Sequence, residues 1–353
     1  MACSAPDMPE PWLSHGRLAV LGTGRALPGA PVGNAALIET MVERFGWTSG
    51  RAATALAKRM VIQTRHFARP FYAAIENARP GQSNSALAAS AVAHALGDAR
   101  LTIKDIGYLI SHTATPDTVL PGNASYVADH LGYAGPHVEL RQACTGFANA
   151  LMIAFGLLAQ PNAKPVAIVG SDTGSLIFDP RWAATDHSHL VNLMQMGDGA
   201  AAIILAPPDQ SSAQLHGAWF GCVGLGRAPG LCIRSGQPAV IDHNYTEIAT
   251  NGRFLFDADR DAAALHGVHI EDANILIPHQ TSGRIGHQVA AHFGLPPERF
   301  FVNANRMGNT GSAAIWLALA EIRANGVQPG TRIVALGAEA TKYMYGGFAY
   351  DQG

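Results

Sequence analysis

The sequence predicts an α/β protein whose β-sheets are largely covered by helices. Along all 353 residues, short runs of β-branched and apolar residues alternate with Ala-rich stretches of helical character. Several strand-like runs are apolar at successive positions, which is typical of strands that are buried on both faces. The 38 glycines and 21 prolines supply turn signals between these elements.

Strand-like runs in the first part of the chain are β-branched and apolar, with turn-forming residues beside them. They cover residues 18–22, 106–111, 137–140, 165–170 and 200–205. Helical stretches cover residues 34–45, 83–96, 123–131 and 146–158. The last of these is apolar nearly all round, which predicts a buried helix.

The same alternation of strand-like and helical segments begins again after the polar, turn-rich segment 207–212. Strands are expected at 215–222, 273–277, 300–302, 332–336 and 346–348, and helices at 254–266, 284–293 and 311–325. We therefore expect two similar halves, residues 1–206 and 213–353. Segments 68–82 and 225–243 lack periodicity and are expected to be loops or lids.

The composition excludes several classes of protein. The chain is 48% hydrophobic and 14% charged, whereas soluble proteins average about 25% charged residues, so disorder and coiled coils are excluded. With a net charge of −2, the chain lacks the excess of basic residues that is typical of nucleic-acid-binding proteins. So few charges predict that part of the surface is covered by another subunit, and we expect a homodimer.

The cysteines and the N-terminus point to a reducing compartment. Cys3, Cys144, Cys222 and Cys232 are too few and too irregularly spaced for a disulfide framework or a zinc ribbon, so no metal is expected. Residues 1–16 lack the pattern of a secretory signal. No apolar window reaches the ~18 residues of a membrane span. We expect a soluble, cytoplasmic protein without a membrane span.

Cys144 lies in the segment Ala143-Cys144-Thr145-Gly146-Phe147, between a strand and an apolar helix. The helix dipole at such a turn favours a thiolate, which predicts a lowered thiol pKa. The amides of the first turn are also donors for an oxyanion. The residue types alone leave a second interpretation open, a small buried apolar side chain.

Two further segments hold polar residues where α/β folds build sites. His279 follows the apolar run Ile275-Leu276-Ile277-Pro278, at the end of an expected strand. Asn309 lies in Gly308-Asn309-Thr310, a loop that opens a helix. Taken singly, His279 could be structural and Asn309 a helix cap.

Together, these segments resemble the β-ketoacyl-acyl-carrier-protein synthase III family of thiolase-fold condensing enzymes. The similarity rests on Ala143-Cys144-Thr145-Gly146-Phe147, Pro278-His279-Gln280 and Gly308-Asn309-Thr310, with supporting matches at Leu21-Gly22-Thr23-Gly24, Thr113-Ala114-Thr115-Pro116-Asp117 and Gly197-Asp198-Gly199-Ala200-Ala201. These segments occur in the family's order along nearly the whole chain. The resemblance implies a five-layered α-β-α-β-α thiolase fold made of two similar halves.

The resemblance also implies a mechanism. Cys144 would take an acyl group from a coenzyme A or acyl-carrier-protein thioester. His279 and Asn309 would then hold the carbonyl of a malonyl-type thioester while carbon dioxide leaves, and the resulting enolate would attack the acyl group. These steps need no metal and no redox cofactor.

Further residues are assigned only through the resemblance. The Cys144 and Thr341 backbone amides are expected to form the oxyanion hole, and Arg284 to dock an acidic carrier protein. Substrate binding is expected of Arg59, Leu120, Ser282 and Gly308. Arg59 lies where the family places an arginine near the coenzyme A phosphates, and Leu120 aligns with the residue that reaches across the family's dimer.

Three departures from the family pattern point to specialised metabolism, such as polyketide synthesis, rather than initiation of fatty-acid synthesis. Thr281-Ser282 follows His279-Gln280 where the family has Ala-Asn, so support of Asn309 is expected to differ. The segment 338–343 replaces a Gly-rich loop. The helix before the His279 strand is expected to be short.

Other functions remain open at this stage. The acyl group could pass from Cys144 to a hydroxyl or amine, or two acyl chains could condense without decarboxylation. A silent partner subunit that binds a carrier protein is a third reading, although such relatives usually lose triad residues. A cysteine hydrolase is disfavoured because nothing singles out a base paired with the thiol and an orienting group.

Overall fold

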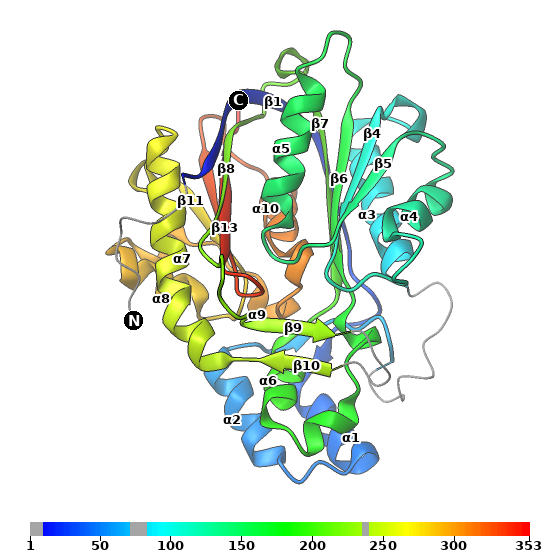
Figure 1. The fold of residues 1–353 in the computed structure, drawn as a ribbon, viewed down its shortest axis with the longest axis vertical. Coiled ribbons are helices and arrows are strands. Elements are labelled where there is room, and N and C mark those ends of the chain that lie inside the picture. The colour runs from blue at the N-terminus through cyan, green and yellow to red at the C-terminus, as the bar shows by residue number, and fades with distance from the viewer. Residues whose placement is uncertain (1–9, 71–82, 235–239) are drawn as a thin grey trace.

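The computed structural model describes residues 10–70, 83–234 and 240–353. Cys3 and most of the segment 68–82 lie outside the described residues. Figure 1 shows helices and strands arranged in alternating layers. No described helix is long and apolar enough to cross a membrane.

Nine strands are connected by hydrogen bonds in the order β11-β12-β13-β8-β1-β7-β6-β4-β5. Their bounds are β1 Trp12–Ala26, β4 Tyr108–His112, β5 His137–Leu140, β6 Val166–Asp172, β7 Gly199–Ala206, β8 Gln214–Cys222, β11 Ile275–Pro278, β12 Arg332–Glu339 and β13 Met344–Asp351. The long β1 joins two groups of strands, because residues 19–26 pair with β7 and residues 12–19 pair with β8.

Helices cover both groups of strands and fill the space between them. Their bounds are α3 Asn84–Ala99, α4 Asn123–Leu131, α5 Gly146–Leu158, α7 Tyr245–Leu265, α8 Ile285–Phe293 and α10 Ala314–Ala324. Helices α5 and α10 lie between the groups, α3 and α4 cover the outer side of one, and α7 and α8 cover the outer side of the other (Figure 1). This is the predicted order of five layers.

The middle layer owes its position to its composition. Helix α5 is apolar on nearly every side, and Phe147, Leu151 and Ala154 are fully buried. In α10, Trp316 stacks on Phe348 of β13 with ring centroids 5.4 Å apart. A helix that is apolar all round has to be buried between two surfaces, and the two groups of strands provide them.

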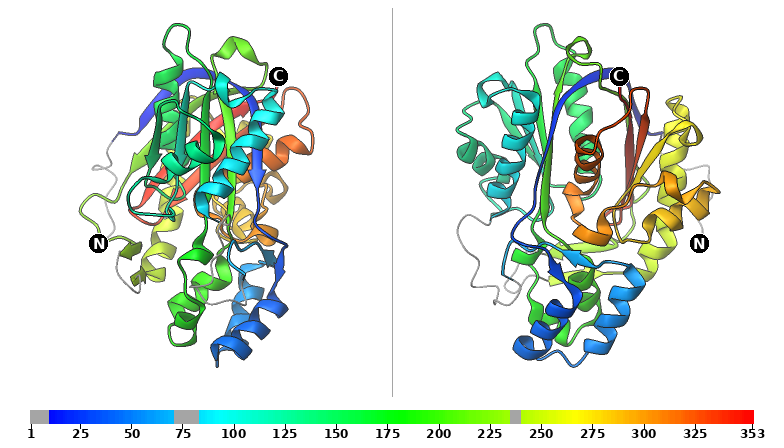
Figure 2. Two further views of the ribbon diagram at one scale, coloured as in Figure 1. Left: turned by 90° about the vertical axis from the view of Figure 1, so that its right-hand side faces the viewer. Right: turned by 180° about the vertical axis from the view of Figure 1, so that it is seen from behind.

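A smaller cluster lies at one end of the layers, at the bottom of Figure 1 and in both views of Figure 2. It contains α1 Asn34–Phe45, α2 Gly50–Met60 and α6 His187–Gln195, with the short strands β2 Val32–Gly33 and β3 Thr64–Arg65 nearby. The short helix α9 Ala304–Met307 contacts β3 and joins this cluster to the second half of the chain.

Some of the predicted elements are wrong. The helix before β11 covers 21 residues, Tyr245–Leu265, so the expected short helix is corrected. Its first turns are mostly polar, which hid their periodicity, and Asn244 caps its start by accepting the Glu247 N–H at 3.1 Å. Residues 300–302 form no strand, because only a single bridge joins Phe300 to Leu276.

The segment 225–243 also differs from the prediction, because it contains a hairpin of β9 Leu231–Arg234 and β10 Val240–His243. Four-residue strands that pair mainly with each other leave little periodicity in a sequence. Segment 207–212 does connect β7 to β8, as expected for a boundary. The division into two halves stays a prediction, since β1 pairs with strands of both.

Candidate active site

Cys144 lies in the turn between β5 and α5, just before Thr145, the residue that caps α5. The backbone of this turn packs tightly against His112 of β4. A Cβ added to Gly146 would lie 2.6 Å from Nδ1 of the buried His112, so only glycine fits there. Gln142 supports the turn by donating from Nε2 to the Thr145 hydroxyl at 2.9 Å. The nucleophile candidate is therefore held on a rigid element.

A buried carboxylate contacts this turn from the other half of the chain. Glu339, the last residue of β12, accepts the Thr145 N–H at 2.8 Å and the Thr145 hydroxyl at 2.7 Å, both through Oε2. Its Oε1 accepts the hydroxyl of Thr341. Glu339 thus joins the Cys144 turn to the turn between β12 and β13.

The surroundings of Cys144 overturn the expected effect of the helix dipole. The pKa of the Cys144 thiol is raised well above its usual value, first by burial and then by the negative charges of Glu339 and Asp172. Sequence reasoning included the dipole of α5 but not these two carboxylates. Cys144 is therefore a neutral thiol at pH 7, and it needs a base before it can act as a nucleophile.

His279 directly follows β11, and its backbone N–H donates to the Leu336 carbonyl of β12 at 2.8 Å. The residue is 3% exposed, and its Nδ1 has no hydrogen-bond partner among the described residues. Burial lowers the pKa of His279 to about 4. The imidazole is therefore neutral at pH 7 and able to accept a proton.

Asn309 lies in the loop between α9 and α10, where its backbone is held on both sides. Its N–H donates to the Gln195 carbonyl at 2.8 Å, and its carbonyl accepts the Gly197 N–H at 3.0 Å. The side-chain Oδ1 accepts the Gly311 N–H at 3.0 Å. Because a backbone N–H can only donate, this bond identifies Oδ1 and leaves Nδ2 as the outward donor.

Hydrogen bonds join the loops that carry the three candidate residues. Gln195 donates from Nε2 to the Thr281 carbonyl at 2.8 Å and accepts the Asn309 N–H, so it connects the His279 and Asn309 loops. Ser312 donates to the Gln142 carbonyl at 3.2 Å, which connects the Asn309 loop to the Cys144 turn. The support of Asn309 therefore comes from the backbone of Gln195.

Asp172, at the end of β6, adds a second connection between the halves. Its Oδ2 accepts the Ser312 N–H at 2.6 Å, and its Oδ1 accepts the Thr115 hydroxyl at 2.8 Å and the Ala114 N–H at 2.9 Å. Burial raises the pKa of Asp172, and these hydrogen bonds oppose the shift. Sequence analysis missed Asp172, Glu339 and Gln195. In the sequence, each of these three residues could have been recognised as a polar residue at the end of an apolar strand or helix.

The two predicted basic residues lie on neighbouring segments. Arg59 is exposed in the last turn of α2, and Arg284 is exposed just before α8. Their backbones meet because Gly283 N–H donates to the Met60 carbonyl at 2.9 Å. Ser282, also in this loop, accepts the Arg284 N–H at 3.3 Å through its hydroxyl. Positive charge therefore gathers beside the loop that carries His279.

Three other predicted residues have different surroundings. Gly308 has φ 70° and packs on the Met196 backbone, where a Cβ would lie 2.9 Å from the carbonyl carbon, so its glycine has a structural reason. Thr341 is half-buried in the turn between β12 and β13. Leu120 is 85% exposed in the loop before α4.

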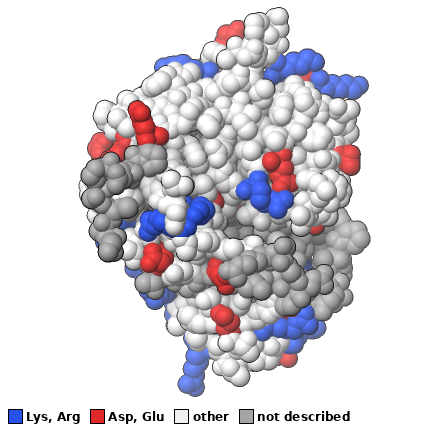
Figure 3. Space-filling view, viewed as in Figure 1, with Lys and Arg blue, Asp and Glu red and all other residues white. Residues whose placement is uncertain are grey.

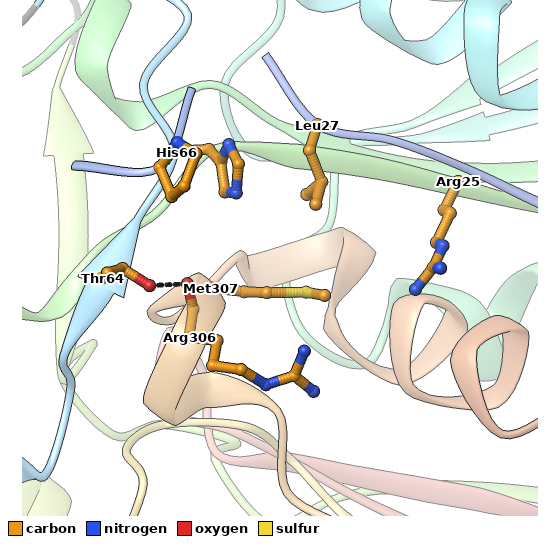
Figure 4. Close-up of a pocket in the computed structure, with 7 residues that line it drawn as sticks. Arg25, Leu27, Thr64, His66, Arg306 and Met307 are labelled. Atoms are coloured by element: carbon orange, nitrogen blue, oxygen red, sulfur yellow. Dashed lines mark hydrogen bonds between the residues drawn. The ribbon is translucent and has the colours of Figure 1, made fainter. Parts of the chain in front are cut away.

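A pocket of about 460 Å³ is lined by residues of β1, β3 and α9 (Figure 4). Arg25, Arg306 and Met307 are among its lining residues. The hydroxyl of Thr64 donates to the Arg306 carbonyl at 2.7 Å. None of the predicted site residues lines this pocket.

Comparison with known proteins identifies the family. Residues 138–224 match the family model described as 3-oxoacyl-[acyl-carrier-protein] synthase III, and residues 263–348 match the model of its C-terminal part. Beta-ketoacyl-[acyl-carrier-protein] synthase III of Nitratidesulfovibrio vulgaris is 34% identical over 272 residues, which are 72% of this chain and 80% of the relative. The chain belongs to the synthase III family.

Other relatives span almost the full chain. The synthase III of Rhodobacter capsulatus is 31% identical over 353 residues, covering 95% of this chain and 97% of the relative. The solved structure of AbyA1, a tetronic acid condensing enzyme, has a TM-score of 0.82 and 26% identity and covers 95% of this chain and 99% of its own. The predicted thiolase fold is confirmed, and the protein is an enzyme of a ketosynthase family of transferases.

Proposed function

We propose that this synthase III family member is an acyl-Cys ketosynthase. It loads an acyl group on Cys144 and condenses it with a malonyl-type thioester, for a fatty-acid-like or polyketide product. The observation that supports this best is the connection of three loops, carrying a thiol, a neutral imidazole and an amide donor, through Gln195 and Ser312. We propose Cys144, His279 and Asn309 as the catalytic residues.

In the loading step, His279 accepts the proton of the Cys144 thiol. The thiolate attacks the acyl thioester, the carbon–sulfur bond of the donor breaks, and its thiolate leaves with the proton from His279. Because burial lowers the pKa of His279 to about 4, the imidazole is unprotonated before the step and is a weak base, so the proton stays on it only until the donor thiolate leaves. The carbonyl oxygen is held by the Cys144 and Thr341 backbone amides.

In the condensing step, neutral His279 and Nδ2 of Asn309 donate to the carbonyl oxygen of the malonyl thioester. The carbon–carbon bond to the carboxylate breaks, carbon dioxide leaves, and the electron pair forms an enolate. The enolate carbon attacks the acyl carbon on Cys144, and the Cys144 thiolate leaves and takes a proton from water. Apart from the water that supplies this proton, every group in these steps belongs to the chain or to the two thioesters, and the proposal needs no metal or redox cofactor.

The donor is a coenzyme A or acyl-carrier-protein thioester. Both carry phosphate, and carrier proteins are acidic, so the exposed Arg59 and Arg284 offer complementary charge. Ser282 and Gly308 border the His279 and Asn309 loops and line the path of the acyl donor in this proposal.

A second copy of the chain completes the enzyme in this proposal. Leu120 and Val119 are 85% and 79% exposed, and β5 pairs on one side only among the strands that the structure describes. Figure 3 shows charged side chains scattered among wide uncharged areas. Exposed apolar side chains beside an unpaired strand edge are features of an interface.

Intact-mass spectrometry with a panel of acyl thioesters tests the proposal. We expect the wild type to gain the mass of one acyl group and Cys144→Ala to gain none. Adding malonyl thioester should remove the adduct, release carbon dioxide and yield a product longer by a two-carbon unit. An adduct on Cys144→Ala, or product without loss of carbon dioxide, would contradict the proposal.

The departures at Thr281-Ser282 and 338–343 favour a second candidate, transfer of the acyl group from Cys144 to a hydroxyl or amine. The free Nδ2 of Asn309 argues against it, because simple acyl transfer forms no enolate. Product mass separates the two candidates, since transfer to a hydroxyl or amine adds no carbon from the malonyl group.

A further inference from the structure

Glu339 combines features that the proposed steps do not require. It is 1% exposed and ends β12, whereas its hydrogen-bond donors lie on two different turns. Thr145 on the first turn follows Cys144 directly. Thr341 on the second turn carries the other backbone amide that is proposed for the oxyanion hole.

The contacts of Glu339 are those of an ionised carboxylate. Oε2 accepts the N–H and the hydroxyl of Thr145 at 2.8 and 2.7 Å, and Oε1 accepts the hydroxyl of Thr341. An ionised carboxylate only accepts hydrogen bonds, and it binds such donors more strongly than a neutral group does. The N–H of Thr145 is also one of the donors that a helix start leaves unpaired.

We propose that Glu339 is a positioning residue that holds the Cys144 turn against the Thr341 turn, so that the thiol and the two oxyanion-hole amides keep one geometry. The inference rests on the proposed function for the role of the two amides. Because the Cys144 turn belongs to the first half of the chain and the Thr341 turn to the second, this single side chain aligns the halves at the reaction centre.

The charge of Glu339 is not neutralised by a base. Among the described residues, no Lys or Arg lies within salt-bridge distance of it. Lys342, on the same turn, donates to the Arg227 carbonyl, and the Arg227 guanidinium lies 4.5 Å from the centre of the Tyr343 ring. The negative charge therefore acts on the Cys144 turn.

Other ionisable groups lie on the elements near the Cys144 turn. Asp172 at the end of β6 contributes a second negative charge, whereas His112 on β4 and His279 after β11 are buried and neutral at pH 7. Glu339 is the larger of the two carboxylate contributions that raise the pKa of Cys144. Positioning by Glu339 thus has a cost, because its charge suppresses the thiolate.

Two substitutions separate the charge from the hydrogen bonds. In Glu339→Gln, the amide oxygen can still accept from Thr145 and the NH₂ can donate to the Thr341 hydroxyl, but the charge is removed. Glu339→Ala removes both. Asp259→Asn is the control for amide substitution of a buried carboxyl, because Asp259 is fully buried and accepts a hydrogen bond from Trp219, whereas burial raises its pKa well above the usual value.

The first measurement is the pH dependence of Cys144 alkylation by iodoacetamide, followed by peptide mass on the full-length protein. We expect the midpoint to move to lower pH in Glu339→Gln and to stay in place in Asp259→Asn. A Glu339→Gln midpoint equal to that of the wild type would overturn the inference. Alkylation needs no acyl donor, so this result does not depend on the proposed function.

The second measurement is the rate of acyl loading at saturating donor. We expect Glu339→Gln to stay within about threefold of the wild type, whereas Glu339→Ala should lose on the order of tenfold or more, because it removes all three hydrogen bonds between the two turns. Equal loading by the two variants would overturn the positioning role. If Glu339→Ala does not fold, the test rests on Glu339→Gln alone. A rate of acyl loading by Glu339→Gln far below that of the wild type would then overturn the positioning role, because this variant keeps the hydrogen bonds. If the wild type loads no donor and the alkylation midpoint still shifts in Glu339→Gln, the proposed function is refuted, but the effect of the Glu339 charge on the Cys144 thiol is not.

Discussion

Asn309 accepts the Gly311 N–H through Oδ1, and this bond decides which end of its amide can reach a substrate. The NH₂ group is left to point away from the loop as a donor. An aspartate would keep the bond to Gly311 but would present an oxygen, and a negative charge, where the donor had been.

We therefore predict that Asn309→Asp retains the fold and acyl loading but loses decarboxylation by about 10²–10³-fold, the usual effect of removing one donor from an anion-stabilising site. Release of carbon dioxide from a labelled malonyl thioester measures the second step, and intact mass measures the first. Asn309→Ala should behave similarly. Carbon dioxide release by Asn309→Asp at the wild-type rate would exclude a role for the Nδ2 donor.

The pKa of His279 predicts the acid side of the loading reaction. Because burial lowers this pKa to about 4, the imidazole can accept the Cys144 proton at all pH values well above 4 and loses this ability below it. Loading should therefore fall as the pH drops through about 4. It should show no separate loss near 6.5, the ordinary value for histidine.

Rapid-quench loading from pH 3.5 up to the pH at which the Cys144 thiol ionises checks this prediction, with His279→Ala as the comparison. In that variant we expect slow loading that rises only as the Cys144 thiol ionises, at a pH above the usual cysteine range. A wild-type profile with its acid limb near 6.5 would mean that His279 is solvated and is not the base.

Much of the fold could be predicted from the sequence because its elements have simple local causes. The helix α5 and the strands β6 and β7 are strongly apolar, and their expected ranges agree with the structure to within two residues. The start of α7 was missed because its first turns carry polar residues. Helix α2 was missed because the residues that it buries, Ala53 and Ala57, are small, and α6 was missed because its buried residues, 190–194, are consecutive and show no helical period.

The candidate site was only partly predictable. Cys144, His279 and Asn309 stand in recognisable segments, but Glu339 and Asp172 act through residues that are distant in the chain. No local pattern shows that a carboxylate at the end of β12 contacts the turn after β5. The expected low pKa of Cys144 was wrong for the same reason.

Charge reversal at the edge of the site should weaken the donor complex. Arg59→Glu and Arg284→Glu are each expected to raise KM for the acyl donor by on the order of tenfold, with a smaller change in kcat, because the contact is made before the reaction. Arg51→Glu, at the exposed start of the same helix α2, is the matched control for Arg59. Steady-state kinetics at two salt concentrations check the prediction, since the effect should shrink as salt screens the charges.

The two types of donor can be distinguished in the same experiment. If Arg284 contacts a carrier protein rather than the phosphates of coenzyme A, Arg284→Glu should raise KM for the acyl-carrier-protein donor only. Equal effects of Arg51→Glu and Arg59→Glu would show that the site senses overall charge and not this position.

His112 provides a prediction about stability. It is fully buried against Gly146 of the Cys144 turn, and its Nε2 accepts the Trp316 N–H at 3.0 Å. Burial lowers its pKa to about 3, against about 6.5 in the unfolded chain. Between these values the unfolded state binds more protons, so the contribution of His112 to stability is present above pH 6.5 and is lost as the pH falls.

We therefore predict that the wild type loses more stability than His112→Gln when the pH is lowered from 7 to 5, because glutamine can accept the Trp316 hydrogen bond through Oε1 without titrating. The quantity to compare is the loss of stability between pH 7 and pH 5 in the wild type minus the same loss in His112→Gln. Asp198 has a pKa raised to about 6 by burial, and its protonation acts in the opposite direction in both. The midpoint of thermal unfolding at each pH measures the effect. If the two proteins lose the same amount of stability, the ring of His112 is not kept neutral by its burial.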